Sequence, residues 1–247
     1  MDSSMYSEMA DLEKNHWWFL GRRAVVFDVL SRTRTSGKLL DIGLGTGFNA
    51  KLFQKMGFSV DGLDPAPEAI AFAKTTAPGV SVIQAPFPSN EVQSNMYDVV
   101  AMLDVLEHLE DDTAALLDVK RVLKSGGIAL ITVPAFQFLW TKHDERAHHF
   151  RRYRKHELLR VVRAAGLELV SMSYYNFFLF PPIALVRVVS KLLKHEEGND
   201  FNKSPGSLNG LFAWLFGFER FLLRAVSLPF GVSLIVLARK PRESLIV

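Results

Sequence analysis

The sequence predicts an α/β fold built on a doubly wound parallel sheet with helices on both faces. Short apolar runs bounded by turn-forming residues recur along the chain, as expected for buried strands. Segments with apolar residues at helical spacing separate these runs, and such alternation is typical of a parallel sheet. The length of 247 residues and a hydrophobic content of 49% suit one domain with a substantial core and an insertion.

Seven strands are expected along the chain. The first five follow apolar runs at 38–42, 59–63, 80–84, 97–102 and 128–133, and two more are expected at 167–175 and 232–238. Apolar residues at helical spacing predict two helices between them, one through Phe48, Leu52, Phe53 and Met56, and one through Leu116, Val119, Val122 and Leu123. Asp111 or Asp112 is available to cap the second helix, and a further helix is expected around 157–165.

Three glycines follow the first strand and indicate a site for a nucleotide-type cofactor. Gly43, Gly45 and Gly47 come after the strand-ending Asp41, where a flat cofactor leaves no room for a Cβ atom. Asp64, at the end of the second strand, would accept hydrogen bonds from both ribose hydroxyls. A dinucleotide also fits this pattern, but the Asp41 carboxylate would repel a pyrophosphate and suits a cationic amino-acid tail. S-adenosylmethionine (SAM) is therefore favoured over a nicotinamide cofactor.

Four segments resemble the class I SAM-dependent methyltransferases of the broad methyltransferase type 11 and 23 families. The resemblance is carried by the runs 41–47 (DIGLGTG), 62–65 (GLDP), 97–109 (YDVVAMLDVLEHL) and 121–127 (RVLKSGG). It implies a Rossmann-like sheet of seven strands, mostly parallel, with an antiparallel last strand. It also implies a cofactor site that contains Asp41, Gly43, Gly45, Gly47, Asp64, Pro65, Ala85 and Leu103. Gln84 departs from the family pattern, because an acid often contacts the adenine amine at that position.

An aromatic and basic segment precedes the first strand. Related methyltransferases often carry a similar leader that folds over the mouth of the cofactor site, so the resemblance implies this role for residues 1–36. Trp18 or Phe19 would then exclude water from the sulfonium, and Arg22 would pair with the methionine carboxylate. The alternative is a helix packed on the sheet with exposed arginines.

One set of candidate catalytic residues follows the fourth strand. Asp104, Glu107 and His108, with His148 from a later loop, resemble a divalent-metal site of ubiquinone-pathway O-methyltransferases and of small-RNA 2′-O-methyltransferases. The same run is common in metal-free relatives, where it orients the loop, and no metal is assigned.

A second set of candidates works without a metal. His148, His149 and Tyr153 follow the fifth strand, and a histidine among them would act as a general base near neutral pH. The predicted catalytic residues are Asp104, His108, His148 and Tyr153.

Charge and cysteine content limit which binding partners and which cellular compartment are expected for the protein. The net charge of +3 does not indicate a polyanion, so no nucleic-acid partner is expected. The chain has no cysteine, which excludes disulfides and fits a reducing compartment. Residues 1–8 lack the basic-then-apolar order of a secretory signal, and we expect a cytoplasmic protein.

Basic residues gather after the fifth strand, where they either form a solvated helix face or recognise a phosphate or an acidic surface: Arg146, Arg151, Arg152, Arg154, Lys155, Arg160 and Arg163.

Residues 176–230 form an insertion far longer than a normal connection between strands. Its apolar runs at 177–186 and 211–216 are too short to span a bilayer. Four interpretations stay open: a lid over a hydrophobic substrate, an interfacial membrane helix, a homodimer surface, or additional core. Residues 195–209 are expected to form a mobile loop. The cofactor-binding domain is then expected to comprise 37–175 and 231–241.

The sequence therefore predicts a SAM-dependent methyltransferase that acts on an oxygen atom of a small acceptor. The apolar insertion favours a hydrophobic or lipid-linked acceptor, which the basic residues would suit if it carries a phosphate. Two alternatives from other classes stay open: a nicotinamide-dependent oxidoreductase, and a non-catalytic Rossmann-like module that docks on a membrane or a partner.

Overall fold

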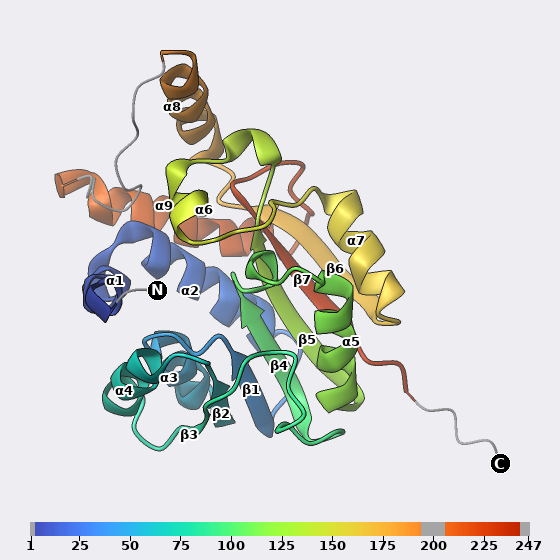
Figure 1. Ribbon diagram of the computed structural model, residues 1–247. Helices are drawn as coiled ribbons and strands as arrows, with labels where there is room; N and C mark the ends of the chain where they lie inside the picture. The colour runs from blue at the N-terminus through green and yellow to red at the C-terminus, as the bar shows by residue number, and fades with distance from the viewer. Residues whose placement is uncertain (1–2, 194–205, 243–247) are drawn as a thin grey trace.

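A seven-stranded sheet with helices on both faces forms the centre of the molecule (Figure 1). The computed structural model describes residues 3–193 and 206–242. The strands are β1 (Lys38–Ile42), β2 (Ser59–Leu63), β3 (Ser81–Ile83), β4 (Tyr97–Leu103), β5 (Leu123–Pro134), β6 (Glu168–Tyr175) and β7 (Ser233–Arg239). Their order is β3-β2-β1-β4-β5-β7-β6, and β7 runs antiparallel to both of its neighbours while the other pairs are parallel. The predicted fold class is confirmed, including the antiparallel last strand.

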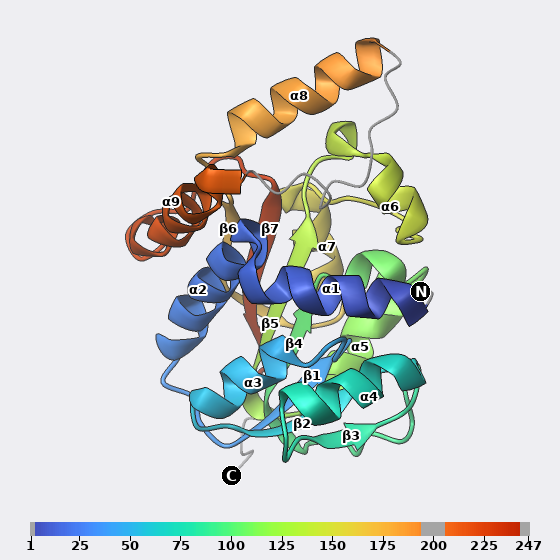
Figure 2. The same ribbon diagram turned by 90° about the vertical axis from the view of Figure 1, so that its left-hand side faces the viewer.

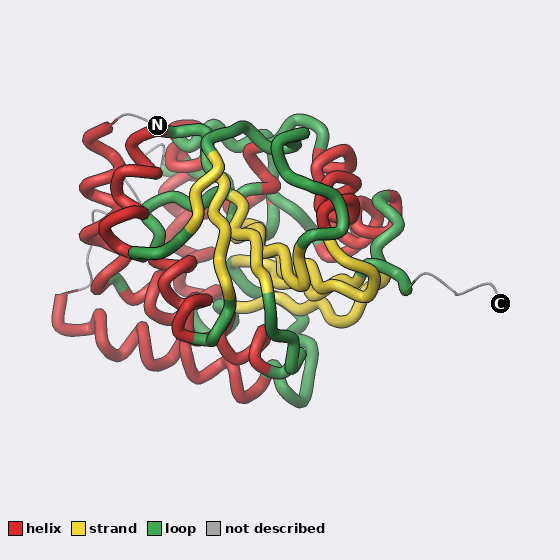
Figure 3. Tube along the Cα trace, turned by 90° about the horizontal axis from the view of Figure 1, so that it is seen from below, coloured by secondary structure: helices red, strands yellow, loops and turns green. Residues whose placement is uncertain are grey.

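Helices cover both faces of the sheet (Figure 3), and two apolar layers hold them against it. In β4, Val100 and Met102 face one layer and Val99 and Ala101 face the other, because successive side chains of a strand point to opposite faces. The first layer lies under α5 and α7, and the second under α2, α3 and α9. The α-helices of the described ranges are α1 (Ser3–Asn15), α2 (Trp17–Ser31), α3 (Phe48–Lys55), α4 (Pro67–Thr76), α5 (Asp112–Val122), α6 (Lys142–Arg146), α7 (Lys155–Ala164), α8 (Phe180–Leu192) and α9 (Asn209–Leu222).

The bounds of α5 and β5 show where the helical pattern ends. Asp111 caps α5, since its carboxylate accepts a hydrogen bond of 2.8 Å from the amide of Ala114. Leu123 continues the apolar series of the helix, but its backbone is extended (φ −67°, ψ 141°) and it pairs with Tyr97. The strand therefore begins at Leu123, whereas the apolar run alone predicted a start at 128.

The insertion between β6 and β7 contributes one packed helix and one exposed helix. α9 packs on α2 so closely that a Cβ atom at Gly21 would lie 2.4 Å from the ring of the fully buried Phe216. α8 has no buried residue and projects beyond the end of the sheet (Figure 2). Most of the predicted mobile loop at 195–209 lies outside the described residues, while Gly206–Leu208 forms a short 3-10 helix and Asn209 begins α9. Within residues 3–193 and 206–242, each helix is too short or too polar to cross a bilayer.

Glu219 of α9 joins the insertion to the end of β6. Its side chain is fully buried, and one carboxylate oxygen accepts hydrogen bonds from the amides of Phe177 and Phe178 at 2.7 and 3.0 Å. The other oxygen has no hydrogen-bond partner among the residues that the structure describes. Burial raises the pKa of Glu219 to about 7.

This raised pKa predicts a loss of stability as pH increases. Between the usual glutamate pKa of 4.5 and about 7, the folded protein binds a proton at Glu219 that the unfolded chain releases. Folding is therefore favoured at low pH at this site, and the contribution is lost as pH rises through about 7. Glutamine stays neutral at every pH. The unfolding free energy of Glu219→Gln, relative to that of the natural protein, is therefore expected to be about 2 kcal/mol higher at about pH 8 than at about pH 5.

Urea unfolding of both proteins at the two pH values measures this difference. The exposed Glu168→Gln serves as the control variant and should give no gain. Unfolding curves of Glu219→Gln that parallel those of the natural protein at both pH values would contradict the assignment.

Candidate active site

A cavity of ≈ 590 Å³ opens at the carboxyl ends of β1 and β4. The chain leaves these two neighbouring strands in opposite directions along the sheet, since β2 lies beyond β1 and β5 beyond β4. Ligands of open α/β sheets bind at this kind of position. The glycine loop, α1, α2, the short helix η1 (Leu106–His108) and α8 contribute the walls.

The glycine loop passes the cavity in a conformation that only glycine adopts easily. Gly43, Gly45 and Gly47 have φ angles of 74°, 53° and 84°. A Cβ atom at Gly43 would lie 2.4 Å from Val105, and one at Gly47 would lie 2.9 Å from Ala73. A Cβ atom at Gly45 would approach only the carbonyl oxygen of Gly43, at 3.9 Å. Gly45 therefore keeps open a volume that belongs to the cavity.

Asp64 fixes the shape of this loop. One of its carboxylate oxygens accepts a hydrogen bond of 2.9 Å from the amide of Gly45, and the other accepts one of 2.9 Å from the amide of Ala66. Of the ten predicted cofactor residues, Trp18, Arg22, Gly43, Gly45 and Leu103 line the cavity. The other five are not among the residues that line it: Asp41, Gly47, Asp64, Pro65 and Ala85.

Arg22 is a buried cation among carboxylates. Its guanidinium forms an ion pair with Asp104, and it lies 4.9 Å from the centre of the Trp18 ring. The pairing of this guanidinium with a ligand carboxylate, expected from the sequence, stays a prediction. Asp41 is fully buried beside the same group, and neither of its oxygens has a hydrogen-bond partner in the described part of the chain. Burial raises the pKa of Asp41, and the Arg22 charge lowers it less.

Glu13 of α1 completes this acidic group, and the sequence analysis did not assign it. Its carboxylate is buried and accepts a hydrogen bond from the hydroxyl of Thr46 in the glycine loop. Burial raises the pKa of Glu13 to about 7, although Arg22 and Arg23 lower it. These carboxyl groups outnumber the cations here, and a bound cation would lower their pKa values and favour their ionised forms. The cavity therefore suits a cationic ligand and disfavours a diphosphate.

A second polar group lies at the side of the cavity nearest η1. Glu107, His108 and His149 each offer a ligand atom, and these atoms lie within 4.8 Å of one another. Glu107 is buried, and its two oxygens have no hydrogen-bond partner within residues 3–193 and 206–242. Burial, with the Asp104 charge, raises the pKa of Glu107. Burial and the neighbouring His149 lower the pKa of His108 to about 4, so His108 is neutral at neutral pH.

His149 is held by a buried carboxylate. Its Nδ1 atom lies 2.8 Å from Asp144, which Arg152 binds through two nitrogens at 2.8 Å each. Burial raises the pKa of Asp144, but the hydrogen bonds from His149 and Arg152 outweigh it and hold this pKa well below its usual range. Asp144 is therefore ionised and orients the imidazole.

His148 does not join this group, although the sequence analysis predicted it as the later histidine. Its side chain is exposed, and its backbone has a φ of 56°, so the chain turns sharply between the two adjacent histidines. His149 takes the place at the cavity that was predicted for His148.

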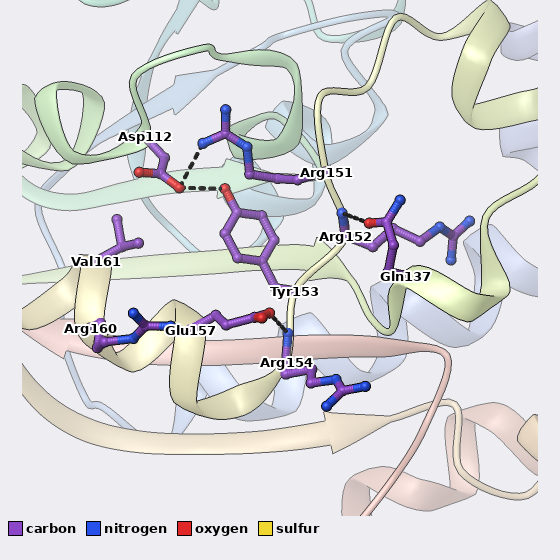
Figure 4. A pocket seen from close by; sticks show the side chains of 9 residues that line it. All are labelled: Asp112, Gln137, Arg151, Arg152, Tyr153, Arg154, Glu157, Arg160 and Val161. Carbon is purple, nitrogen blue, oxygen red and sulfur yellow. Dashed lines mark hydrogen bonds and ion pairs between the residues drawn. The ribbon is translucent and has the colours of Figure 1, made fainter.

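Tyr153 also lies away from the cavity that contains Asp104 and His108. Figure 4 shows it in a second, shallower pocket, where its hydroxyl donates to Asp112 at 3.0 Å and Arg151 binds the same carboxylate at 2.9 Å. Burial raises the pKa of Tyr153, so it stays protonated at neutral pH. Arg151 and Arg152, two of the predicted basic cluster, form internal ion pairs.

Comparisons with known proteins agree with this geometry. A family model described as a methyltransferase domain matches residues 20–172. A probable S-adenosylmethionine-dependent methyltransferase of Mycobacterium tuberculosis is 30% identical over 124 residues, which are 50% of this chain and 45% of the relative. The chain thus spans about half the length of this relative. A ubiquinone biosynthesis O-methyltransferase of Pseudomonas aeruginosa is 30% identical over 158 residues, which cover 56% of this chain and 68% of that protein.

Solved structures share the fold over most of the chain. A putative methyltransferase of Haloferax volcanii, solved in complex with the Trm112 methyltransferase activator, has a TM-score of 0.65 and 17% identity, with 97% of this chain and 96% of that chain covered. A putative sarcosine dimethylglycine methyltransferase from Galdieria sulphuraria has a TM-score of 0.61 and 21% identity, with 90% and 86% covered. The family model covers more than half of the sequence, and the order of the strands matches the fold of such methyltransferases. The chain therefore belongs to the class I SAM-dependent methyltransferases, within the methyltransferase-domain family.

Proposed function

We propose that the protein transfers the methyl group of SAM to an oxygen atom of a small hydrophobic or lipid-linked acceptor. The observation that carries this proposal is the pair Asp144 and His149, whose imidazole lines the same cavity as the glycine loop. A hydroxyl acceptor needs a base to take its proton. The similarity to ubiquinone biosynthesis O-methyltransferases supports an oxygen acceptor.

The residues at the glycine-loop side of the cavity are proposed to hold the cofactor. When bound, SAM supplies a methyl group on a sulfonium ion, which carries its own leaving group. Gly45 leaves space for a flat ligand, and the positive charge of SAM would favour the ionised forms of Glu13 and Asp41. Asp64 is assigned to the ribose. Residues 1–36 are proposed as the cover, and the cofactor site would also include Trp18, Arg22, Gly47, Pro65, Ala85 and Leu103.

His149 is proposed as the general base. Because Asp144 is ionised and binds Nδ1, the neutral imidazole carries its proton there, and the other ring nitrogen is left to accept. The free ring nitrogen of His149 would accept the proton of the acceptor hydroxyl, while SAM would supply the methyl group to the oxygen and leave as a neutral thioether. Asp144 then stabilises the imidazolium, and Arg152 keeps Asp144 in place.

The wall opposite the glycine loop defines the class of acceptor. Pro182, Ile183 and Val186 of α8 line the cavity together with Phe212 of α9, so an apolar body fits there. Asn176 is fully buried in the same lining, and no described residue is a hydrogen-bond partner of its amide group. A buried amide of this kind favours a ligand with a polar head. The cavity therefore suits an amphipathic acceptor.

A transfer assay tests this proposal. The protein is incubated with methyl-labelled SAM and a bacterial lipid extract, and label is expected in the organic phase in a form stable to alkali, as for a methyl ether. His149→Ala should reduce the rate at least about hundredfold, because general-base catalysis is lost. His148→Ala is the matched control, since that side chain is exposed. Equal rates for the two variants would contradict the role of His149.

Ligand binding separates the proposal from the two alternatives. Calorimetry should show binding of S-adenosylhomocysteine (SAH) and none of NADH, which carries a diphosphate. Binding of NADH alone would favour the oxidoreductase, and binding of SAH without transfer to any acceptor would favour the non-catalytic module.

Glu107, His108 and His149 are also a candidate site for a divalent cation, because their ligand atoms cluster and both oxygens of Glu107 lack partners among the described residues. The two roles exclude each other, since a histidine bound to a cation is not available as a base. We expect treatment with a chelator to leave methyl transfer unchanged. A loss of activity that Mn²⁺ or Zn²⁺ restores in the natural protein, but not in Glu107→Gln, would instead assign these residues as ligands.

A further inference from the structure

The two helices of the insertion carry an uncovered apolar surface that the proposed chemistry does not use. On α8, Leu185, Val189 and Leu192 are 65%, 40% and 77% exposed. On α9, Leu211 and Trp214 are 53% and 63% exposed. Exposed apolar side chains of this size that cluster along a helix mark a contact with a partner or a membrane.

This surface forms one stripe along each helix. At about 3.6 residues per turn, the exposed apolar residues of each helix recur on one side. The other side of α9 packs on α2, whereas α8 has no buried residue at all. The stripe of α8 is therefore not part of the core. We define the α8–α9 face as the exposed residues Leu185, Val188, Val189, Leu192, Leu211, Trp214, Phe218 and Phe221.

The charge beside this face is positive. α8 contains two cations and no acidic residue. Lys191 is exposed and donates to the carbonyl oxygen of Phe138 at 2.7 Å, whereas Arg187 lines the cavity and donates to that of Leu139 at 2.8 Å. The one acidic residue of α9, Glu219, is fully buried, while Arg220 beside it is partly exposed. Two helices with exposed apolar stripes, whose exposed charges are cations, complement an anionic lipid surface, whereas two copies of them would repel each other.

We propose that the α8–α9 face docks on the surface of a lipid bilayer that contains anionic phospholipid. Both helices are too short to cross the bilayer, so they lie in its interfacial region. The exposed Trp214 is a side chain that prefers this region, since the ring is amphipathic. The projection of α8 beyond the end of the sheet leaves this helix accessible to a flat surface (Figure 2).

The same helix connects the docking face to the cavity. Val186 is 60% exposed and also lines the cavity, and Ile183 lines it one turn earlier. The apolar stripe and the cavity wall are thus two sides of α8. The next step rests on the proposed function. An acceptor with an apolar chain would leave the bilayer along Val186 and enter the cavity without exposing its chain to water.

Vesicle flotation of the full chain tests the docking. The protein is mixed with vesicles of phosphatidylglycerol and phosphatidylcholine, or with vesicles of phosphatidylcholine alone. We expect binding to the first kind, weaker binding to the second, and a decrease with added salt. The triple variant Leu185→Ser, Val189→Ser, Leu192→Ser should reduce the partition coefficient at least about tenfold, because it removes apolar area from the interface.

The control variant is Leu117→Ser, Val170→Ser, which removes side chains that are 48% and 46% exposed elsewhere on the molecule. It should float like the natural protein. SAH binding should be unchanged in both variants, and this readout separates docking from the proposed function. Equal flotation of the triple variant and the natural protein would overturn the proposal. So would absence of flotation, or a dimer in sedimentation velocity that only the triple variant disrupts.

Discussion

Alanine at Gly45 is expected to lower the affinity of the protein for SAH about hundredfold, with a loss of stability limited to the backbone strain. The added Cβ atom would approach only the carbonyl oxygen of Gly43, at 3.9 Å, so the fold itself has room for it. The methyl group instead occupies the volume that the cofactor needs. The backbone at φ 53° adds strain of about 1–2 kcal/mol for any residue with a Cβ atom. Calorimetric titration with SAH measures the affinity, and thermal unfolding measures the stability.

Gly57 provides a matched control for this prediction. It has a φ of 90°, and a Cβ atom there would meet nothing within 4 Å. Gly57→Ala therefore introduces similar strain at a turn far from the cavity lining. We expect both variants to lose similar stability and only Gly45→Ala to lose SAH binding. Tight SAH binding by Gly45→Ala would show that the loop does not hold the cofactor.

Replacing Arg22 by alanine is expected to cause the largest loss of stability, about 3–5 kcal/mol of unfolding free energy. The guanidinium is buried and pairs with Asp104, and its charge also acts on Glu13, Asp41 and Glu107. Without it, Asp41 and Asp104 lose this compensating charge, and Glu13 and Glu107 keep only the charges of Arg23 and Arg152. The loss should be greater at about pH 8 than at about pH 5, because the carboxyl groups become protonated as pH falls. Urea unfolding at both pH values checks this result.

Two further variants test the cause. Arg22→Ala combined with Asp104→Asn should recover part of the stability, since the second change removes one uncompensated charge. Lys14 forms an ion pair with Asp11, and their side chains are 55% and 81% exposed. Lys14→Ala breaks this pair and should lower the unfolding free energy by less than about 1 kcal/mol. An Arg22→Ala protein as stable as Lys14→Ala would refute the electrostatic role of Arg22.

The sheet could be predicted closely because its signals are local. The runs at 38–42 and 59–63 have the bounds of β1 and β2, since each is apolar and ends at a turn-forming residue. The glycine positions were predictable for the same reason, because a positive φ excludes most other residues. β5 was predicted too short, because the glycines before its apolar part resemble a turn, while pairing with β4 extends the strand to Leu123.

The site could be predicted only where it lies on these local elements. Adjacent histidines such as His148 and His149 look alike in the sequence, and only the backbone turn at His148 decides which one enters the cavity. Tyr153 follows the same loop but points to the other side, toward Asp112. Glu13 lies in a polar segment whose pattern gives no sign of burial, because α1 becomes buried there only by packing over the glycine loop. These outcomes depend on contacts between distant segments.

The place of β7 between β5 and β6 determines when the molecule can finish folding during synthesis. Until 233–239 leave the ribosome, β5 and β6 have no strand to join them, and each presents an unpaired edge. The apolar stripes of α8 and α9 emerge before that strand. The nascent chain therefore passes through an interval in which unpaired strand edges and exposed apolar helix surfaces are present together. Protection from aggregation by chaperones would matter most for this protein during that interval.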